Sequence, residues 1–83
     1  MSTVVNYIAF YDSKKVIEKR HYPATMTTGA IVTNIHGEKI ETQDSSLPTG
    51  AHRIQIIRSA KKPLEYRVPW GAVRFRIGYE EIK

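Results

Sequence analysis

The 83-residue sequence contains no cysteine. This absence excludes a disulfide framework, a thiolate zinc site and a cysteine nucleophile, and it fits a reducing cytoplasm. No stretch approaches the roughly 18 consecutive apolar residues that a membrane-spanning helix needs. The first 15 residues also lack the basic start of a secretory signal. We therefore expect a cytoplasmic chain that neither enters nor crosses a membrane.

Glycine and histidine are too sparse for a recognisable cofactor or metal site. The five glycines stand singly, so the chain has no glycine-rich phosphate loop. The sequence separations between His21, His36 and His52 are 15 and 16 residues, whereas metal-binding histidines readable from sequence lie a few residues apart. The run from Asp44 to Ser46 lacks the strained G-x-S-x-G turn of a hydrolase nucleophile. We expect no enzymatic activity, no metal and no cofactor.

Size and composition point to one small globular domain spanning residues 1–83. A mass of 9.5 kDa leaves no room for two domains. Hydrophobic residues make up 41% of the chain and charged residues 25%, which is typical of folded rather than disordered proteins. A chain of this mass buries about 60% of its unfolded surface on folding. A pocket for a large cofactor would consume much of such a core.

The positive charge is concentrated at the C-terminal end. The formal net charge is +5, and residues 51–83 alone hold eight basic and three acidic side chains. An excess confined to one region favours an anionic partner: nucleic acid, the acidic face of a protein or a membrane headgroup layer. An ordinary solvated basic surface is the alternative interpretation.

The N-terminal region has the pattern of a β-hairpin. The segment 4–11 is rich in β-branched and aromatic residues at both parities, as in a strand that is covered on both faces. Polar residues 12–15 then predict a turn, and residues 16–22 predict the returning strand. A short helix over residues 13–20, capped by Ser13, is the alternative.

A second hairpin is predicted around His36 and Gly37. The strands 30–35 and 38–42 flank these two residues. If Gly37 takes the left-handed position of a three-residue loop, Val32 and Ile40 lie opposite each other on one face. Burial favours this pairing of two apolar side chains.

Three further segments complete the central part of the chain. Residues 23–29 interrupt the strand pattern, and residues 43–50 form the longest polar loop. Residues 51–59 predict a strand, in which apolar residues at 54, 56 and 57 break the alternation and indicate a bulge or burial on both faces.

The last hairpin is predicted from apolar pairing. Joining residues 64–68 to residues 73–77 through the loop 69–72 places Tyr66 opposite Phe75 on a wholly apolar face. The other face then carries Glu65 opposite Arg76, and Arg67 directly opposite Arg74. Two arginines so placed repel each other by about 0.2–1 kcal/mol. Water relieves this repulsion by screening, and a bound anion relieves it by bridging the two guanidinium groups.

Aromatic residues leave several roles open. Trp70, at the tip of the loop 69–72, is expected to plug the end of the fold, to stack on a base, or to anchor in a partner protein. Tyr66 and Tyr79 fall in the apolar set and are predicted to be core residues. Tyr11 and Tyr22 are predicted to be freer for exposure.

Together these patterns predict an all-β single small domain of five or six short antiparallel strands, a barrel-like or sandwich-like meander with at most one short helix. The expected function is binding without chemistry: nucleic acid on an arginine-bearing sheet face with aromatic residues at its rim. The alternative is a regulatory or inhibitory module that docks its basic face and Trp70 on an acidic protein. The candidate binding residues for either partner are Arg53, Arg58, Arg67, Trp70, Arg74 and Arg76.

Overall fold

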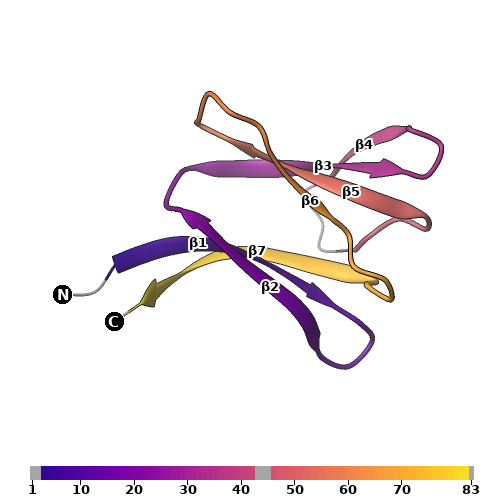
Figure 1. Cartoon of the computed structure of the whole chain (residues 1–83), viewed down its shortest axis with the longest axis horizontal. Coiled ribbons are helices and arrows are strands. Elements are labelled where there is room, and N and C mark those ends of the chain that lie inside the picture. The colour runs from indigo at the N-terminus through magenta and orange to yellow at the C-terminus, as the bar shows by residue number, and fades with distance from the viewer. Residues whose placement is uncertain (1–2, 43–45, 83) are drawn as a thin grey trace.

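A computed structural model describes residues 3–42 and 46–82 of the chain. Within these residues the fold is all-β, and two antiparallel sheets pack face to face as a sandwich (Figure 1). The all-β prediction is therefore confirmed, and the sandwich is the variant that forms. The predicted loop residues 43–45 lie outside the described residues. The strands are β1 (Thr3–Tyr11), β2 (Val16–Pro23), β3 (Thr27–Asn34), β4 (Lys39–Thr42), β5 (Ala51–Arg58), β6 (Leu64–Arg67) and β7 (Arg74–Ile82).

The three-stranded sheet has the order β2-β1-β7, with β1 in the centre as predicted. The turn between β1 and β2 is closed by Asp12, whose Oδ1 accepts the backbone amides of Lys14 and Lys15 at 2.7 and 2.8 Å. These hydrogen bonds lower the pKa of Asp12. The alternative helix over residues 13–20 does not form, because the chain turns back at once and β2 begins at Val16.

The four-stranded sheet has the order β4-β3-β5-β6. Its β3–β4 hairpin has the predicted register, with Val32 opposite Ile40. Gly37 takes a positive φ of 79° in the turn, and the side chain of Asn34 accepts the amides of His36 and Glu38. β3 begins three residues earlier than predicted, so the break after β2 is shorter than the sequence suggested.

Strand β5 confirms the predicted strand, but its bulge lies before residues 54, 56 and 57, the positions at which the broken alternation predicted it. Thr33 pairs with Arg53 and Asn34 with Ala51, so His52 is an extra residue on β5. Beyond this bulge the side chains of Ile54 and Ile56 both enter the core.

The predicted hairpin between β6 and β7 is wrong. β6 pairs with β5 in one sheet and β7 pairs with β1 in the other, so the segment 68–73 crosses from one layer to the other (Figure 1). Tyr66 therefore lies opposite Ile54, and Phe75 lies opposite Phe10. The apolar side chains of both strands still point into the core, as predicted. They do so from opposite layers of the sandwich, and not from neighbouring strands of one sheet.

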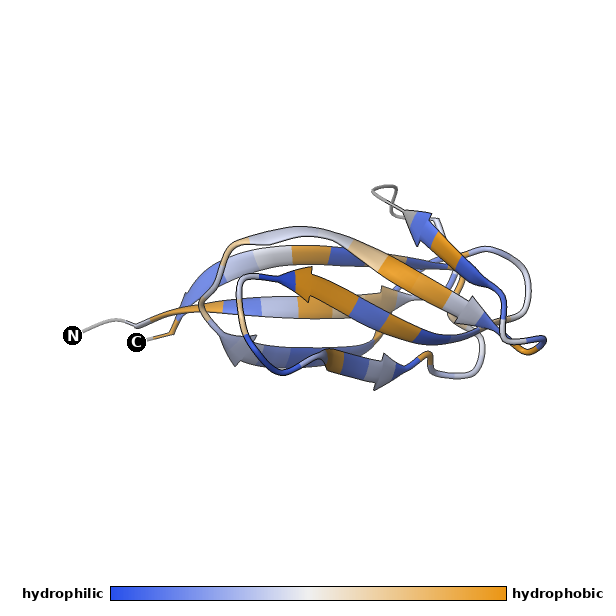
Figure 2. Cartoon of the chain, turned by 90° about the horizontal axis from the view of Figure 1, so that it is seen from above, coloured by the Kyte–Doolittle hydropathy of each residue, from blue (hydrophilic) through white to orange (hydrophobic). Residues whose placement is uncertain are grey.

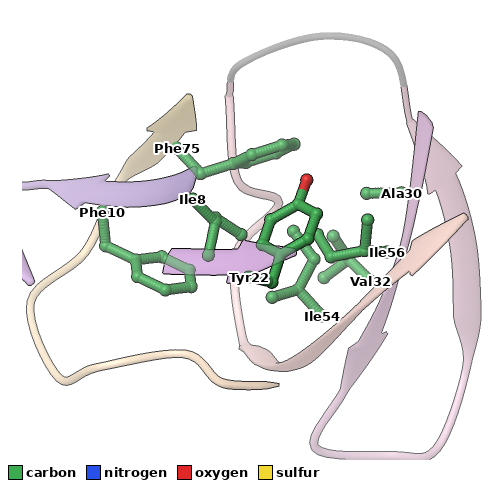
Figure 3. Packing of buried hydrophobic residues seen from close by; sticks show 8 residues of the cluster. All are labelled: Ile8, Phe10, Tyr22, Ala30, Val32, Ile54, Ile56 and Phe75. Carbon is green, nitrogen blue, oxygen red and sulfur yellow. The ribbon is translucent and has the colours of Figure 1, made fainter. Parts of the chain in front are cut away.

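The core lies between the sheets, and both layers contribute to it (Figure 3). Apolar and polar residues alternate along several strands, as expected when one face is buried and the other is not (Figure 2). Burial of these side chains supplies the main stabilisation of a domain this small. The buried cluster consists of Ile8, Phe10, Tyr22 and Phe75 from the three-stranded sheet and Ala30, Val32, Ile54 and Ile56 from the four-stranded sheet.

Two tyrosine predictions are corrected by this packing. Tyr22 was expected to be exposed, but it is buried and its hydroxyl lies 3.1 Å from Thr27 Oγ1. Tyr79 is predicted as a core residue, but 75% of it is exposed, although it lies on the same face of β7 as the buried Phe75. The reason is its position on β7, an edge strand of the three-stranded sheet, where Tyr79 borders an open hollow with Met26 and Thr27. Tyr66 is half-buried and packs against the core, as predicted.

Within residues 3–42 and 46–82 no helix is long and apolar enough to span a membrane. The same residues contain no group of three or more histidine and carboxylate side chains arranged to hold a metal ion.

Candidate functional site

The structure divides the six predicted binding residues among separate surfaces. Arg74 and Arg76 flank the buried Phe75 on β7, so they lie on the outer face of the three-stranded sheet. Arg53 and Arg67 lie on the outer face of the four-stranded sheet, on the opposite side of the molecule. One continuous arginine face does not exist among these residues.

The predicted pairings across the last hairpin are corrected accordingly. Arg67 does not lie opposite Arg74, and Glu65 does not lie opposite Arg76. Arg67 lies opposite Arg53 in the β5–β6 pair, and Glu65 lies opposite Gln55. Two arginines are again direct neighbours, but on a different pair of strands. Glu65 Oε1 accepts a hydrogen bond from Arg53 Nη1 at 3.0 Å.

Arg58 belongs to neither arginine pair. Its Nη2 donates to the carbonyl oxygen of Lys62 at 3.1 Å, which ties the end of β5 to the connection that leads into β6. Its Nε is buried and has no hydrogen-bond partner among residues 3–42 and 46–82. This side chain supports the β5–β6 connection and does not join the outer-face arginines.

Trp70 does not plug the fold. It is 97% exposed at the tip of the turn that connects β6 to β7. Two of the predicted roles for Trp70 need an exposed indole and fit this position: stacking on a base and anchoring in a partner protein.

The outer face of the three-stranded sheet gathers aromatic and charged side chains that the sequence analysis did not bring together. We call it the tyrosine face. In the observed register Tyr7 lies opposite His21, and Tyr11 lies opposite Arg74. Which residues share one face of a sheet depends on the register between its strands, and β7 is far from β1 in the sequence. No local sequence pattern therefore predicts this group of side chains. The tyrosine face consists of Tyr7, Tyr11, Lys19, His21, Arg74, Arg76 and Glu80.

Both tyrosine rings of this face carry a cation. Arg74 Cζ lies 5.4 Å from the centroid of the Tyr11 ring, and Lys19 Nζ lies 4.6 Å from the centroid of the Tyr7 ring. A cation held over the face of an aromatic ring is attracted by the ring quadrupole. The two rings differ in how firmly the cation is held.

Lys19 is fixed over Tyr7 by an ion pair. Its Nζ lies 2.8 Å from Glu80 Oε1, and the same carboxylate contacts His21 Nε2. These contacts connect β2 to β7 across the central strand. The hydrogen bonds from Lys19 and His21 lower the pKa of Glu80, and the bond to Glu80 raises the pKa of Lys19. The Tyr7 end of the face is therefore closed by internal pairing.

The Tyr11 end of the face is open. A hollow of about 380 Å³ is lined by Tyr11, Arg74, Phe75 and Arg76. Arg76 is exposed and has no ion-pair partner in the described part of the chain. An aromatic ring, a guanidinium lying over it and a second, unpaired guanidinium thus border one hollow. Such a set matches a flat ring and an anionic group in the same ligand.

A second hollow lies at the same end of the sandwich. A cleft of about 650 Å³ separates the segment 47–52 from the segment 67–73, which carries Trp70. The turn between β1 and β2 also lies at this end, whereas both termini lie at the other (Figure 1).

Comparisons of the chain with protein-family models, with curated proteins and with solved structures found no match.

Proposed function

We propose that this chain is a non-catalytic cytoplasmic module that binds single-stranded nucleic acid on its tyrosine face. The observation that carries the proposal is the hollow lined by the Tyr11 ring, the guanidinium of Arg74 and Arg76. Proteins that bind single strands without sequence preference combine a basic groove with aromatic platforms on which bases stack.

Each group in the hollow has a distinct task in this proposal. A base stacks on the Arg74 guanidinium, which Tyr11 supports from below at 5.4 Å. Arg76, which no carboxylate neutralises in the described chain, contacts the phosphate backbone. The net charge of +5 favours the approach of a polyanion.

The test is to titrate a fluorescent single-stranded oligonucleotide with the unlabelled protein and its variants, and to measure the affinity at several salt concentrations. For a single strand, each neutralised phosphate adds about 0.7 to the slope of log affinity against log salt. Arg76→Gln should lower this slope by roughly that amount. Tyr11→Ala removes the ring that holds the Arg74 guanidinium in place and should cost about 0.5–1 kcal/mol of binding free energy. Arg53→Gln, which removes an arginine from the opposite sheet, is the matched control and should change neither quantity.

The same experiment separates the alternative function. A module that docks on an acidic protein through its basic face and Trp70 attracts oligonucleotides weakly, and its binding responds equally to the removal of any arginine. Equal effects of Arg76→Gln and Arg53→Gln, with no effect of Tyr11→Ala, would contradict the nucleic-acid proposal. That result would favour the protein partner.

A further inference from the structure

The turn that carries Trp70 holds its backbone in one conformation. The amide of Ala72 donates to the carbonyl of Pro69 at 3.2 Å, and Gly71 at the third position has a φ of +88°. A positive φ at this position is the mark of a type II turn, which favours glycine there. Trp70 therefore stands at the second position of a defined turn, with 97% of its surface exposed. A rigid turn presents the indole without a large loss of chain entropy on binding.

The cleft beside this turn is of a size that ligands occupy. Its volume of about 650 Å³ falls within the range of about 300–1,000 Å³ found for small-molecule sites. One wall is the segment from Leu47 to His52, and the other is the segment from Arg67 to Val73. The two walls are joined by a hydrogen bond at 2.9 Å from the Val68 amide to the His52 carbonyl.

Arg67 brings an unbalanced positive charge to this cleft. It lies directly opposite Arg53 on the neighbouring strand, an arrangement of like charges that destabilises the sheet. The carboxylate of Glu65 pairs with Arg53 at 3.0 Å. Arg67, which lines the cleft, has no ion-pair partner among the described residues. An anion bound in the cleft would neutralise the guanidinium of Arg67, which no described carboxylate pairs.

We propose that this cleft is a nucleotide site, in which the base stacks on Trp70 and the phosphate binds Arg67. An exposed indole takes any base by its π-face, and a guanidinium takes phosphate through two parallel hydrogen bonds. Both residues line this cleft. This site is separate from the tyrosine face, and it does not depend on the function proposed for that face.

Trp70 is the only tryptophan in the chain, so its fluorescence reports this cleft alone. The probes are adenosine monophosphate, adenosine and inorganic phosphate. Adenosine monophosphate should quench the emission saturably, adenosine should bind about tenfold more weakly, and inorganic phosphate should leave the emission unchanged. Emission that does not respond to adenosine monophosphate would overturn the site.

Substitutions assign the two contacts. Arg67→Gln should abolish the difference in affinity between adenosine monophosphate and adenosine. Trp70→Ala, followed by the anisotropy of a fluorescent adenosine monophosphate analogue, should weaken binding roughly 5- to 100-fold. Lys61→Gln removes an exposed positive charge from the connection between β5 and β6, outside both hollows; it is the matched control and should leave binding of the monophosphate unchanged. Equal losses in Arg67→Gln and Lys61→Gln would overturn the assignment, because they would reflect net charge alone.

Two further measurements distinguish nucleotide binding in the cleft from oligonucleotide binding on the tyrosine face. Tyr11→Ala should leave quenching by adenosine monophosphate intact even where it abolishes oligonucleotide binding. An oligonucleotide that displaces the monophosphate identifies the cleft as part of a strand-binding path, and failure to displace it identifies a site for the free nucleotide. Loss of the monophosphate site in Tyr11→Ala would contradict a separate site in the cleft.

Discussion

The ring of Tyr7 lies against Gly78 of the neighbouring strand, so that a Cβ atom on Gly78 would come within 3.0 Å of the Tyr7 hydroxyl oxygen. Glycine in a strand interior leaves a gap in the sheet surface. Here an aromatic ring from the paired strand covers that gap, a contact that is known to stabilise sheets. The relationship also fixes the ring under Lys19, which closes one end of the tyrosine face.

This contact makes Tyr7 a stability residue. We expect Tyr7→Ala to lower the free energy of unfolding by about 1–2 kcal/mol, because it uncovers Gly78 and removes the surface on which Lys19 rests. Urea denaturation measures the loss. The control is Tyr79→Ala, since Tyr79 is 75% exposed and its removal should change the stability by less than about 0.5 kcal/mol. A larger cost for Tyr79 than for Tyr7 would contradict the contact between the Tyr7 ring and Gly78.

Substitution of Phe75 should lower the free energy of unfolding more than substitution at most other positions. Its ring is 5% exposed and pairs with Phe10 inside the sandwich. Phe75→Ala should cost roughly 3–5 kcal/mol, and Phe75→Leu should give a smaller loss that remains measurable by thermal denaturation if the alanine variant fails to fold. Trp70→Ala, which removes a larger but exposed ring, should leave the melting temperature nearly unchanged. The core assignment fails if the two alanine variants are equally damaging.

The strand pairing can be tested with engineered disulfides, since the chain has no cysteine of its own. Arg53 and Arg67 are Cα partners, and the hydrogen bond from Val68 to His52 makes them a non-hydrogen-bonded pair. Such pairs have Cα atoms about 4.5 Å apart, within the range that a disulfide bridges. Arg53→Cys with Arg67→Cys should oxidise to an intramolecular disulfide, which mass spectrometry detects.

The contrasting pair is Arg67→Cys with Arg74→Cys. These two positions would be direct neighbours in a β6–β7 hairpin, but they lie in different sheets of the sandwich. This variant should remain reduced as a monomer under the same conditions. Rapid formation of its disulfide would contradict the crossing of the chain between layers at residues 68–73.

The ion pairs of Glu80 with Lys19 and His21 predict that the protein loses stability in acid. Hydrogen bonds from Lys19 and His21 hold the pKa of Glu80 below its ordinary value of 4.5. Because the pKa is lower in the folded state, this contribution to stability is present above the unfolded-state pKa and disappears as the pH falls through the folded-state pKa. Glu80→Gln should therefore flatten the decline in stability below pH 4.5, measured by urea denaturation across the acid range.

The matched control for this titration is Glu81→Gln. Glu81 is the exposed neighbour of Glu80 and has no ion-pair partner in the described part of the chain. Its removal should leave the acid decline as steep as in the unmodified protein. If both variants flatten the decline equally, the ion pairs across the tyrosine face do not hold in solution.

The sequence by itself determined two hairpins, the one between β1 and β2 and the one between β3 and β4. The turns at Asp12 and Gly37 are encoded locally, by a side chain that caps backbone amides and by a residue that accepts a positive φ. With the turn fixed, apolar alternation leaves one register, which is why Val32 and Ile40 were paired correctly. The all-β class follows from the same spacing of turns.

Only the tertiary structure decided which strands share a sheet. Apolar alternation predicts that Tyr66 and Phe75 are turned inward, but it does not distinguish a partner beside the strand from one across the core. Phe75 pairs with Phe10, which lies 65 residues away in the chain, and that pairing depends on the packing of both layers. The same long-range register assembled the tyrosine face and separated Arg67 from Arg74. The candidate sites therefore emerged from contacts between distant residues, which no local pattern encodes.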